Sequence, residues 1–83
     1  MYYMYILQSL KDNKLYIGYT NNLKLRLAEH KDGDVESTRH RKPIELIYYE
    51  AYKTEKLARE RELKLKQFGS AHKALMKRLN IPK

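Results

Sequence analysis

Arg26 and His30 are the first residues in this sequence whose types and spacing could perform chemistry. They lie four residues apart in a segment with helical periodicity, so both side chains project from the same face of a helix. An arginine there can donate two parallel hydrogen bonds to a phosphate, and a histidine can relay a proton. The alternative is a solvated arginine beside a histidine at the core boundary, and this pair alone does not exclude it.

A carboxylate on a later helical segment, TEKLARERELKLKQF, is the second candidate. The apolar stripe of that helix is expected to consist of Leu57, Ala58, Leu65 and Phe68. Glu60 is expected on the flank of the stripe, whereas Glu62 is expected to point largely away from it. Geometry therefore favours Glu60, which could hold Mg²⁺ while water and phosphate oxygens complete the octahedron. Glu60 also precedes Lys64 by four residues, which is the spacing of an ordinary surface ion pair.

Tyr5 and Tyr16 are the third candidate, because a phenol can act as an acid or a base. They fall in two aromatic and β-branched stretches that predict adjacent strands of a hairpin. Alternate residues of a strand share a face, so Tyr5 lies on the same side as Tyr3 and Leu7. The hairpin register decides whether Tyr16 joins them. A cross-strand aromatic pair without a chemical role is the alternative.

The elements that must position these residues follow from the apolar pattern of the chain. Strands are predicted at 2–9, 15–19 and 44–52, and helices at about 22–31, 54–68 and 71–79. Gly18, inside the second strand, indicates a bulge or a close backbone approach. The order β-β-α-β-α-α predicts an α+β fold in which helices flank a three-stranded, mostly antiparallel sheet.

The net charge narrows the partners that such a fold would bind. Lys and Arg number 18 and Asp and Glu number 10 among 83 residues, so the formal net charge is +8. That excess favours nucleic acid, because each neutralised phosphate releases counterions. A membrane partner is not expected, because no apolar run could span or anchor in a bilayer. One domain over residues 1–83 and, since no signal peptide is recognised, a cytoplasmic location are expected.

Taken together, the spacing of these residues resembles the GIY-YIG nuclease family. Tyr5 lies in a degenerate first motif, Met4-Tyr5-Ile6, and the second motif, Tyr16-Ile17-Gly18, is intact. The stretches YIGYTNNLKLRLAEH, STRHRKPIELIYYEAY and LARERELKLK are similar to the elements that follow in the family. The resemblance covers residues 2–79. It is closest to small stand-alone members and more distant to the N-terminal domain of excision-repair nucleases.

This resemblance implies a metal-dependent endonuclease that hydrolyses phosphodiester bonds in DNA, with a role in repair or recombination. Tyr5 or Tyr16 would be the general base or would orient the attacking water. Arg26 would stabilise the charge that builds on the scissile phosphate, and His30 would assist proton transfer. Glu60 would be the sole protein ligand of Mg²⁺ or Mn²⁺ on the leaving-group side.

Two departures from the family keep an alternative open, namely a nucleic-acid-binding module of the same fold with weak or no turnover. The first motif lacks Gly-Ile before its tyrosine. In addition, Ser70, Ala71 and His72 occupy the region where many members carry an asparagine. Since family members usually take specificity from a second domain, low sequence specificity is expected here. A homodimer or a partner protein could supply targeting.

Substrate contacts are also expected from basic side chains outside the catalytic set. Arg39, Arg41 and Lys42 lie in a basic segment, residues 32–43, that is predicted to be irregular, and Lys64 lies on the carboxylate helix. Such contacts position a phosphate backbone and carry no sequence information. A solvated run of charges is the alternative.

Overall fold

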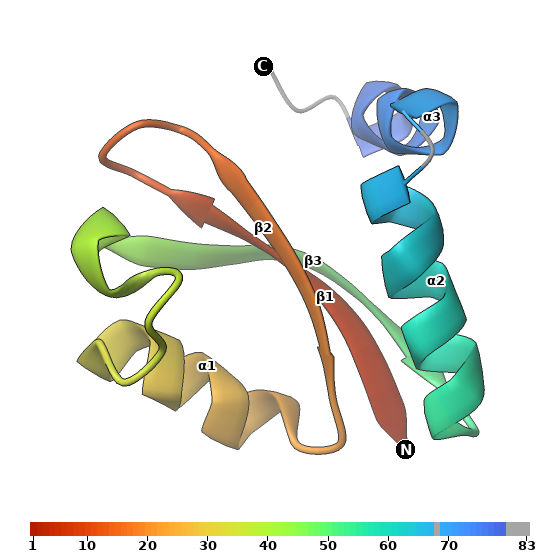
Figure 1. Ribbon diagram of the computed structural model, residues 1–83, viewed down its shortest axis with the longest axis horizontal. Coiled ribbons are helices and arrows are strands. Elements are labelled where there is room, and N and C mark those ends of the chain that lie inside the picture. Colours follow the sequence, from red (N-terminus) through yellow and green to blue (C-terminus); the bar gives the residue numbers. More distant parts are fainter. Residues whose placement is uncertain (68, 80–83) are drawn as a thin grey trace.

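The computed structural model describes residues 1–67 and 69–79 and confirms the predicted α+β class and element order (Figure 1). The strands are β1 (Tyr2–Ser9), β2 (Leu15–Thr20) and β3 (Ile44–Tyr52). The helices are α1 (Leu23–Asp32), α2 (Glu55–Gln67) and α3 (Gly69–Leu79), and a 3₁₀ helix, η1, spans Arg39–Arg41. The third helix begins two residues earlier than predicted. The predicted end of the second helix, Phe68, lies outside the described residues.

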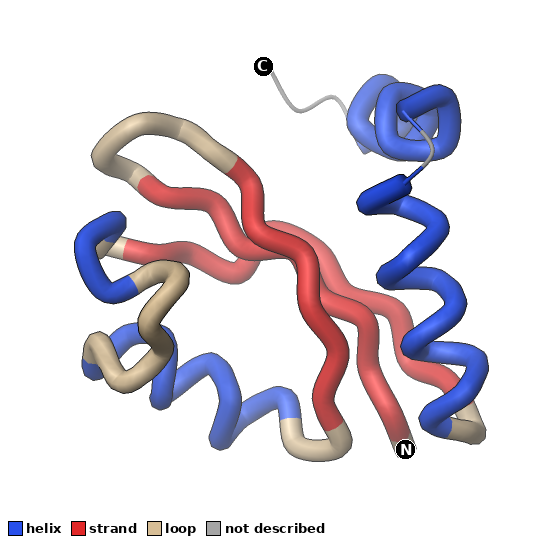
Figure 2. Tube along the Cα trace, viewed as in Figure 1, coloured by secondary structure: helices blue, strands red, loops and turns tan. Residues whose placement is uncertain are grey.

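β1 is the central strand of the sheet, which has the order β2-β1-β3 with both pairs antiparallel (Figure 2). Tyr5 of β1 lies opposite Gly18 of β2, and Leu7 lies opposite Tyr16. Since Tyr5 and Leu7 share one face of β1, Tyr16 lies on that face too. The register therefore makes Tyr5 and Tyr16 diagonal neighbours on one side of the hairpin.

The two faces of β1 are covered by different helices, with α1 on one side and α2 and α3 on the other (Figure 1). On the first side, Tyr5 and Leu7 cluster with Leu23 and Leu27 of α1. On the second side, the strand and helix residues of the core are Met4, Ile6, Leu65, Leu75 and Met76. The alternation of apolar residues along β1 thus produces a helix–sheet–helix arrangement. No helix in the described part of the chain is long and apolar enough to cross a membrane.

Both ends of α1 are fixed by capping interactions. The Asn22 side chain accepts a hydrogen bond from the Leu25 backbone N–H at 3.0 Å, so Asn22 is the N-cap of the helix. At the other end Gly33 adopts the left-handed conformation, with φ of 81°, and its N–H bonds to the carbonyls of Glu29 and His30. These caps set where the helix begins and ends, and so they set the directions in which its side chains project.

A polar cluster joins β3 to α2. Glu50 of β3 accepts hydrogen bonds from the hydroxyls of Tyr48 and Tyr52, at 2.7 and 2.5 Å, and from Arg61 Nε at 3.0 Å. Burial alone would raise the pKa of Glu50, but the hydrogen bonds from Tyr52, Tyr48 and Arg61 hold that pKa below its usual range. Arg61 immediately precedes Glu62, so this ion pair helps to fix the rotation of α2 about its own axis.

The segment between Gly33 and Pro43 is attached to the sheet by polar contacts rather than left as an irregular loop. Ser9 Oγ donates to the Arg41 carbonyl at 2.7 Å, and the Leu10 N–H donates to the Pro43 carbonyl at 2.9 Å. Thr38, just before η1, has no exposed surface. The predicted irregular segment therefore contains one helical turn and is held in place at both ends of that turn.

Candidate active site

A cleft of about 580 Å³ lies beside the edge strand β2 and takes its lining from both sides of the sheet. It is lined by Tyr5 from β1, Tyr16 and Gly18 from β2, Arg26 and His30 from α1, and Glu62 and Lys66 from α2. Four of the five residues predicted to form a catalytic site are thus together, and Glu60 is not among them. The cleft is lined by polar and apolar side chains alike and is continuous across the β2 edge.

Tyr5 enters the cleft over the backbone of Gly18. A β-carbon built at Gly18 would lie 2.5 Å from the Tyr5 hydroxyl and 2.6 Å from the ring carbon that carries it. The close approach predicted for Gly18 is therefore found, and the bulge in the sheet falls elsewhere, between Ile6 and Leu7. Gly18 is needed at this position because any side chain would displace the Tyr5 phenol.

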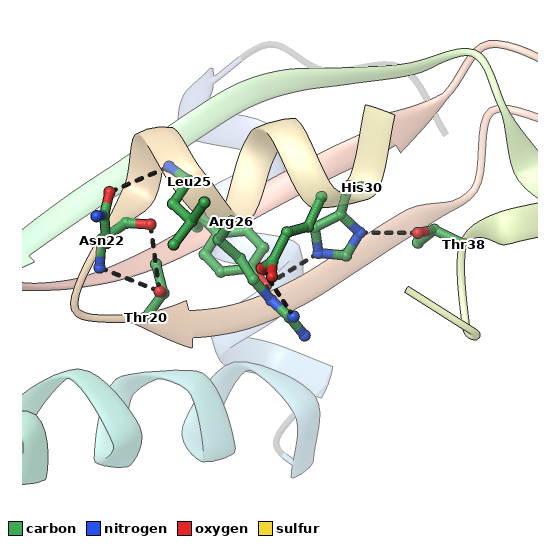
Figure 3. Close-up of polar contacts among 8 residues, drawn as sticks. Thr20, Asn22, Leu25, Arg26, His30 and Thr38 are labelled. Carbon is green, nitrogen blue, oxygen red and sulfur yellow. Dashed lines mark hydrogen bonds and ion pairs between the residues drawn. The ribbon is translucent and has the colours of Figure 1, made fainter. Parts of the chain in front are cut away.

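A chain of hydrogen bonds runs through the Tyr5 hydroxyl and the His30 ring. The Tyr5 hydroxyl oxygen lies 3.2 Å from His30 Nε2 and also accepts from Arg26 Nε at 3.4 Å. On the other side of the ring, His30 Nδ1 lies 2.7 Å from Thr38 Oγ1 (Figure 3). His30 is 4% exposed, so both ring nitrogens are occupied by protein groups rather than by solvent.

The electrostatics of α1 favour a neutral histidine beside a charged arginine. Burial holds the pKa of His30 below its ordinary value, and the positive charge of Arg26 lowers it further, while Glu29 partly offsets both effects. The hydrogen bond to Tyr5 is the main cause that raises the pKa of Arg26. Arg26 also forms an ion pair of 3.4 Å with Glu29. Both side chains of that pair are more than a third exposed, so the pair adds little to stability.

Glu60 is exposed and does not line the cleft, so its expected placement beside the site is wrong. Glu62, which was expected to point away, is 9% exposed and lines the cleft. The buried face of α2 consists of Ala58, Glu62 and Leu65, and Leu57 is 46% exposed. At roughly 100° per residue, Glu62 lies about 50° from the mean direction of Ala58 and Leu65, whereas Glu60 lies about 150° away.

Glu62, Lys66 and Thr38 are polar residues of the site that were not predicted to belong to the catalytic set. Glu62 and Lys66 form an ion pair one helical turn apart, with Nζ 3.4 Å from Oε2, and both line the cleft. The seven-residue spacing of Ala58 and Leu65, which brackets Glu62, was the signal for this face. Thr38 had no signal in the sequence, because it lies in a segment without periodicity and only the folded loop brings it to His30.

The predicted substrate-binding residues lie outside the cleft lining. Arg39 and Lys64 are exposed, whereas Arg41 is half-buried and pairs with Asp12 at 3.4 Å. Lys42 lies near Gly33 at the end of α1. Their proposed contacts with phosphate stay predictions.

The donor set of the cleft bears on whether it could hold a metal ion. Among the described residues, no three His, Cys, Asp or Glu side chains gather in a metal-binding group. Glu62 contributes one carboxylate, a hard oxygen donor that suits Mg²⁺ or Mn²⁺. Such a site fits an ion that takes most of its ligands from water and substrate, and it does not fit an ion enclosed by protein.

Comparison with known proteins identifies the class to which this fold and cleft belong. A family model described as the GIY-YIG catalytic domain matches residues 1–80. A UPF0213 protein of Staphylococcus haemolyticus is 38% identical over 76 residues, which cover 90% of this chain and 92% of that protein. A UPF0213 protein of Natronomonas pharaonis is 40% identical over 73 residues, with 87% and 85% coverage.

One solved structure is also similar to this chain. The solution NMR structure of a UPF0213 protein from Bacillus halodurans has a TM-score of 0.57 and 31% sequence identity, and the match covers 95% of this chain and 85% of that one. The chain therefore belongs to the GIY-YIG family, as its motifs predicted, and groups within it with the small UPF0213 proteins.

Proposed function

We propose that this chain is a divalent-metal-dependent phosphodiesterase that cuts nucleic acid, with DNA as the expected substrate and with low sequence specificity. The observation that carries the proposal is the meeting of Tyr5, Tyr16, Arg26, His30 and Glu62 in one cleft, although they come from four different elements. A net charge of +8 supports a polyanionic substrate. Membership of the GIY-YIG family supports the reaction class.

The chemistry of phosphodiester hydrolysis assigns a role to each of these groups. The Arg26 guanidinium would donate to the non-bridging oxygens of the scissile phosphate, where negative charge increases in the transition state. A tyrosine hydroxyl at the cleft surface would orient the attacking water and take up its proton. His30, buried against Tyr5, would hold that hydroxyl in place. Tyr16 lies close enough in the same cleft to serve as the alternative base.

Glu62 replaces Glu60 as the proposed metal ligand, because Glu62 is the carboxylate that faces the cleft. When bound, the ion would supply positive charge against the phosphate and the departing oxygen. The ion pair with Lys66 must loosen for Glu62 to use both oxygens, since Lys66 Nζ lies 3.4 Å from Oε2. Lys66, which also lines the cleft, would then be free to contact a phosphate.

The test is a cleavage assay on plasmid, flap and single-stranded DNA with Mg²⁺ or Mn²⁺, with EDTA as the blank. Arg26→Ala should lower kcat/KM by about 10² or more, the usual scale for one donor to a transition-state charge. Arg59→Ala is the matched control, because Arg59 is exposed and its loss changes the net charge equally. Equal loss of activity in the two variants would contradict the assigned site.

The second candidate function is a nucleic-acid-binding module of the same fold, and the Glu62–Lys66 ion pair is the observation that favours it. A lysine that neutralises the carboxylate can occupy the place of a metal ion. Such a module would bind DNA in a salt-dependent manner and show no cleavage with either metal. Cleavage that EDTA abolishes and Arg26→Ala reduces would exclude it. Targeting by a homodimer or a partner protein, and a role in repair, stay predictions.

A further inference from the structure

Thr38 and His30 form the most buried polar contact near the cleft. Thr38 has no exposed surface, and its Oγ1 lies 2.7 Å from His30 Nδ1. On the opposite side of the ring, Nε2 lies 3.2 Å from the Tyr5 hydroxyl oxygen. The same oxygen receives the Arg26 Nε–H, at 3.4 Å. Because a neutral imidazole carries one N–H, the direction of each of these bonds depends on which nitrogen holds the proton.

The two neutral tautomers of His30 reverse the donor and acceptor roles in the hydrogen bonds from Thr38 through the ring to Tyr5. With the proton on Nδ1, the ring donates to Thr38 and accepts the Tyr5 hydroxyl proton at Nε2. With the proton on Nε2, Thr38 donates to Nδ1, and the ring donates to the Tyr5 oxygen. In the first case the Tyr5 hydroxyl donates its hydrogen bond to histidine, and in the second its hydrogen points toward the cleft. The lowered pKa of His30 leaves these two neutral forms as the ones to compare at neutral pH.

The hydrogen-bonding needs of Thr38 decide between them. Among the described residues, the only recorded partner of Thr38 Oγ1 is His30 Nδ1. If Nδ1 carried the proton, the Thr38 hydroxyl hydrogen would be buried without an acceptor, and a buried unsatisfied donor is costly. If Nε2 carries the proton, the Thr38 hydroxyl has an acceptor in Nδ1 and the ring N–H has an acceptor in Tyr5. The Tyr5 hydrogen then faces the cleft, which holds room for water.

The two distances agree with this assignment. Hydroxyl donors make shorter hydrogen bonds to oxygen than N–H donors do, with typical separations of about 2.7–2.8 Å and about 2.9–3.0 Å respectively. The 2.7 Å contact at Thr38 fits a hydroxyl that donates to Nδ1. The 3.2 Å contact at Tyr5 fits an N–H that donates to oxygen.

We propose that Thr38 is a positioning residue that donates its hydroxyl hydrogen to His30 Nδ1 and thereby holds the ring in the Nε2–H tautomer. The Tyr5 oxygen then receives two N–H donors, one from His30 and one from Arg26. His30 is in this arrangement a fixed donor to Tyr5 and not the acceptor of its proton. The tautomer assignment concerns only the folded protein and does not depend on the proposed function.

The catalytic consequence rests on the proposed function. The two N–H donors would stabilise the negative charge that the Tyr5 oxygen must carry to act as a base, and they favour Tyr5 over Tyr16 for that role. Tyr5 first releases its hydrogen to solvent through the cleft. As water attacks phosphorus, a water O–H bond breaks, the proton moves to the Tyr5 oxygen and the new P–O bond forms. The ester P–O bond breaks, and the leaving oxygen takes a proton from solvent.

The direct test is proton–nitrogen correlation NMR on protein with nitrogen-labelled histidine, at about pH 8, where imidazole is neutral. The His30 signals are assigned by elimination with His40→Gln and His72→Gln. We expect the Nε2–H tautomer in the wild type and in Thr38→Ser, which keeps the hydroxyl. Thr38→Val has nearly the same shape without the donor, and it should show a mixture of tautomers. An Nδ1–H tautomer in the wild type would overturn the proposal even if Thr38→Val failed to fold, and so would an unchanged tautomer in folded Thr38→Val.

A kinetic arm separates this proposal from the proposed function. If the protein cleaves DNA, Thr38→Val should lower kcat roughly tenfold, the scale of one hydrogen bond to a charged group, with KM within about twofold, and Thr38→Ser should restore kcat. An unchanged kcat would refute the catalytic consequence and leave the tautomer assignment to the NMR result. If neither the wild type nor any variant cleaves DNA, the proposed function fails, and the NMR result still decides the role of Thr38.

Discussion

The Tyr5 hydroxyl lies so close to Gly18 that a β-carbon at position 18 would stand 2.5 Å from it. In Gly18→Ala the phenol must move, which should disturb its bonds to His30 and Arg26. We expect the free energy of unfolding to fall by about 1–3 kcal/mol and cleavage to fall at least tenfold. Denaturant melts and cleavage assays on the folded variant measure the two effects. Full activity in Gly18→Ala would show that the position of the Tyr5 hydroxyl does not matter.

Glu62→Gln should remove metal-dependent cleavage, because it exchanges the carboxylate that faces the cleft for a neutral amide. We expect kcat to fall by about 10² or more, with half-saturation by Mg²⁺ shifted to higher concentration. Glu60→Gln is the matched control: it makes the same change two residues away, at an exposed position, and should leave both quantities within about twofold. If only Glu60→Gln lost cleavage activity, Glu60, the carboxylate favoured by the sequence, would be the metal ligand instead.

Glu50→Gln should weaken the fold most at neutral pH. The pKa of Glu50 in the folded protein is below its ordinary value, so the stabilisation is present above the unfolded pKa and is lost as pH falls through the folded pKa. We expect a difference in unfolding free energy of about 1–3 kcal/mol near neutrality. That difference should shrink as the solution is made acidic. Glu45→Gln, an exposed change on the same strand, should show no such difference in denaturant melts across pH.

Asn22→Ala should destabilise the helix that carries Arg26 and His30. The Asn22 side chain accepts the Leu25 N–H, and loss of an N-cap costs about 1 kcal/mol. Backbone amide hydrogen exchange in the first turn of α1 should accelerate, because the Leu25 N–H loses its hydrogen-bond acceptor. Asn21→Ala is the neighbouring control, and equal effects of the two substitutions would argue against the cap.

Arg39→Ala should weaken DNA binding without changing the chemical step, because Arg39 lies on η1 outside the cleft. If Arg39 contacts one phosphate, the slope of log Kd against log salt should decrease in magnitude by about 0.9 for double-stranded DNA. Single-turnover cleavage at saturating protein should stay near the wild-type rate. An unchanged slope would leave Arg39 as part of a solvated charge run.

Much of the fold was predictable because its signals are local. The alternation of apolar residues in β1, the turn after Ser9 and the Asn22 cap each depend on neighbours in the chain. The same locality explains why Arg26 and His30 were found, since a spacing of four on a helix places them on one face.

The rotation of α2 about its own axis could not be predicted from such local signals. Leu57 is large and apolar yet exposed, so it shifted the apparent stripe away from the buried face of the helix. The true direction depends on the contact between Arg61 and Glu50, which joins a helix to a strand. Thr38 is a similar case, because its partner is known only once the segment after α1 folds back.

The placement of the cleft at the β2 edge has a consequence for the chain during its synthesis. Tyr5, Tyr16, Arg26 and His30 lie on one side of the sheet, whereas Glu62 and Lys66 arrive from the helix on the other side. A nascent chain that has emerged only through α1 holds the phenols and the arginine without the carboxylate. Under the proposed function, a ribosome-bound fragment that ends after α1 would therefore not cleave nucleic acid. Cleavage would begin only after α1 and α2 have both packed on the sheet.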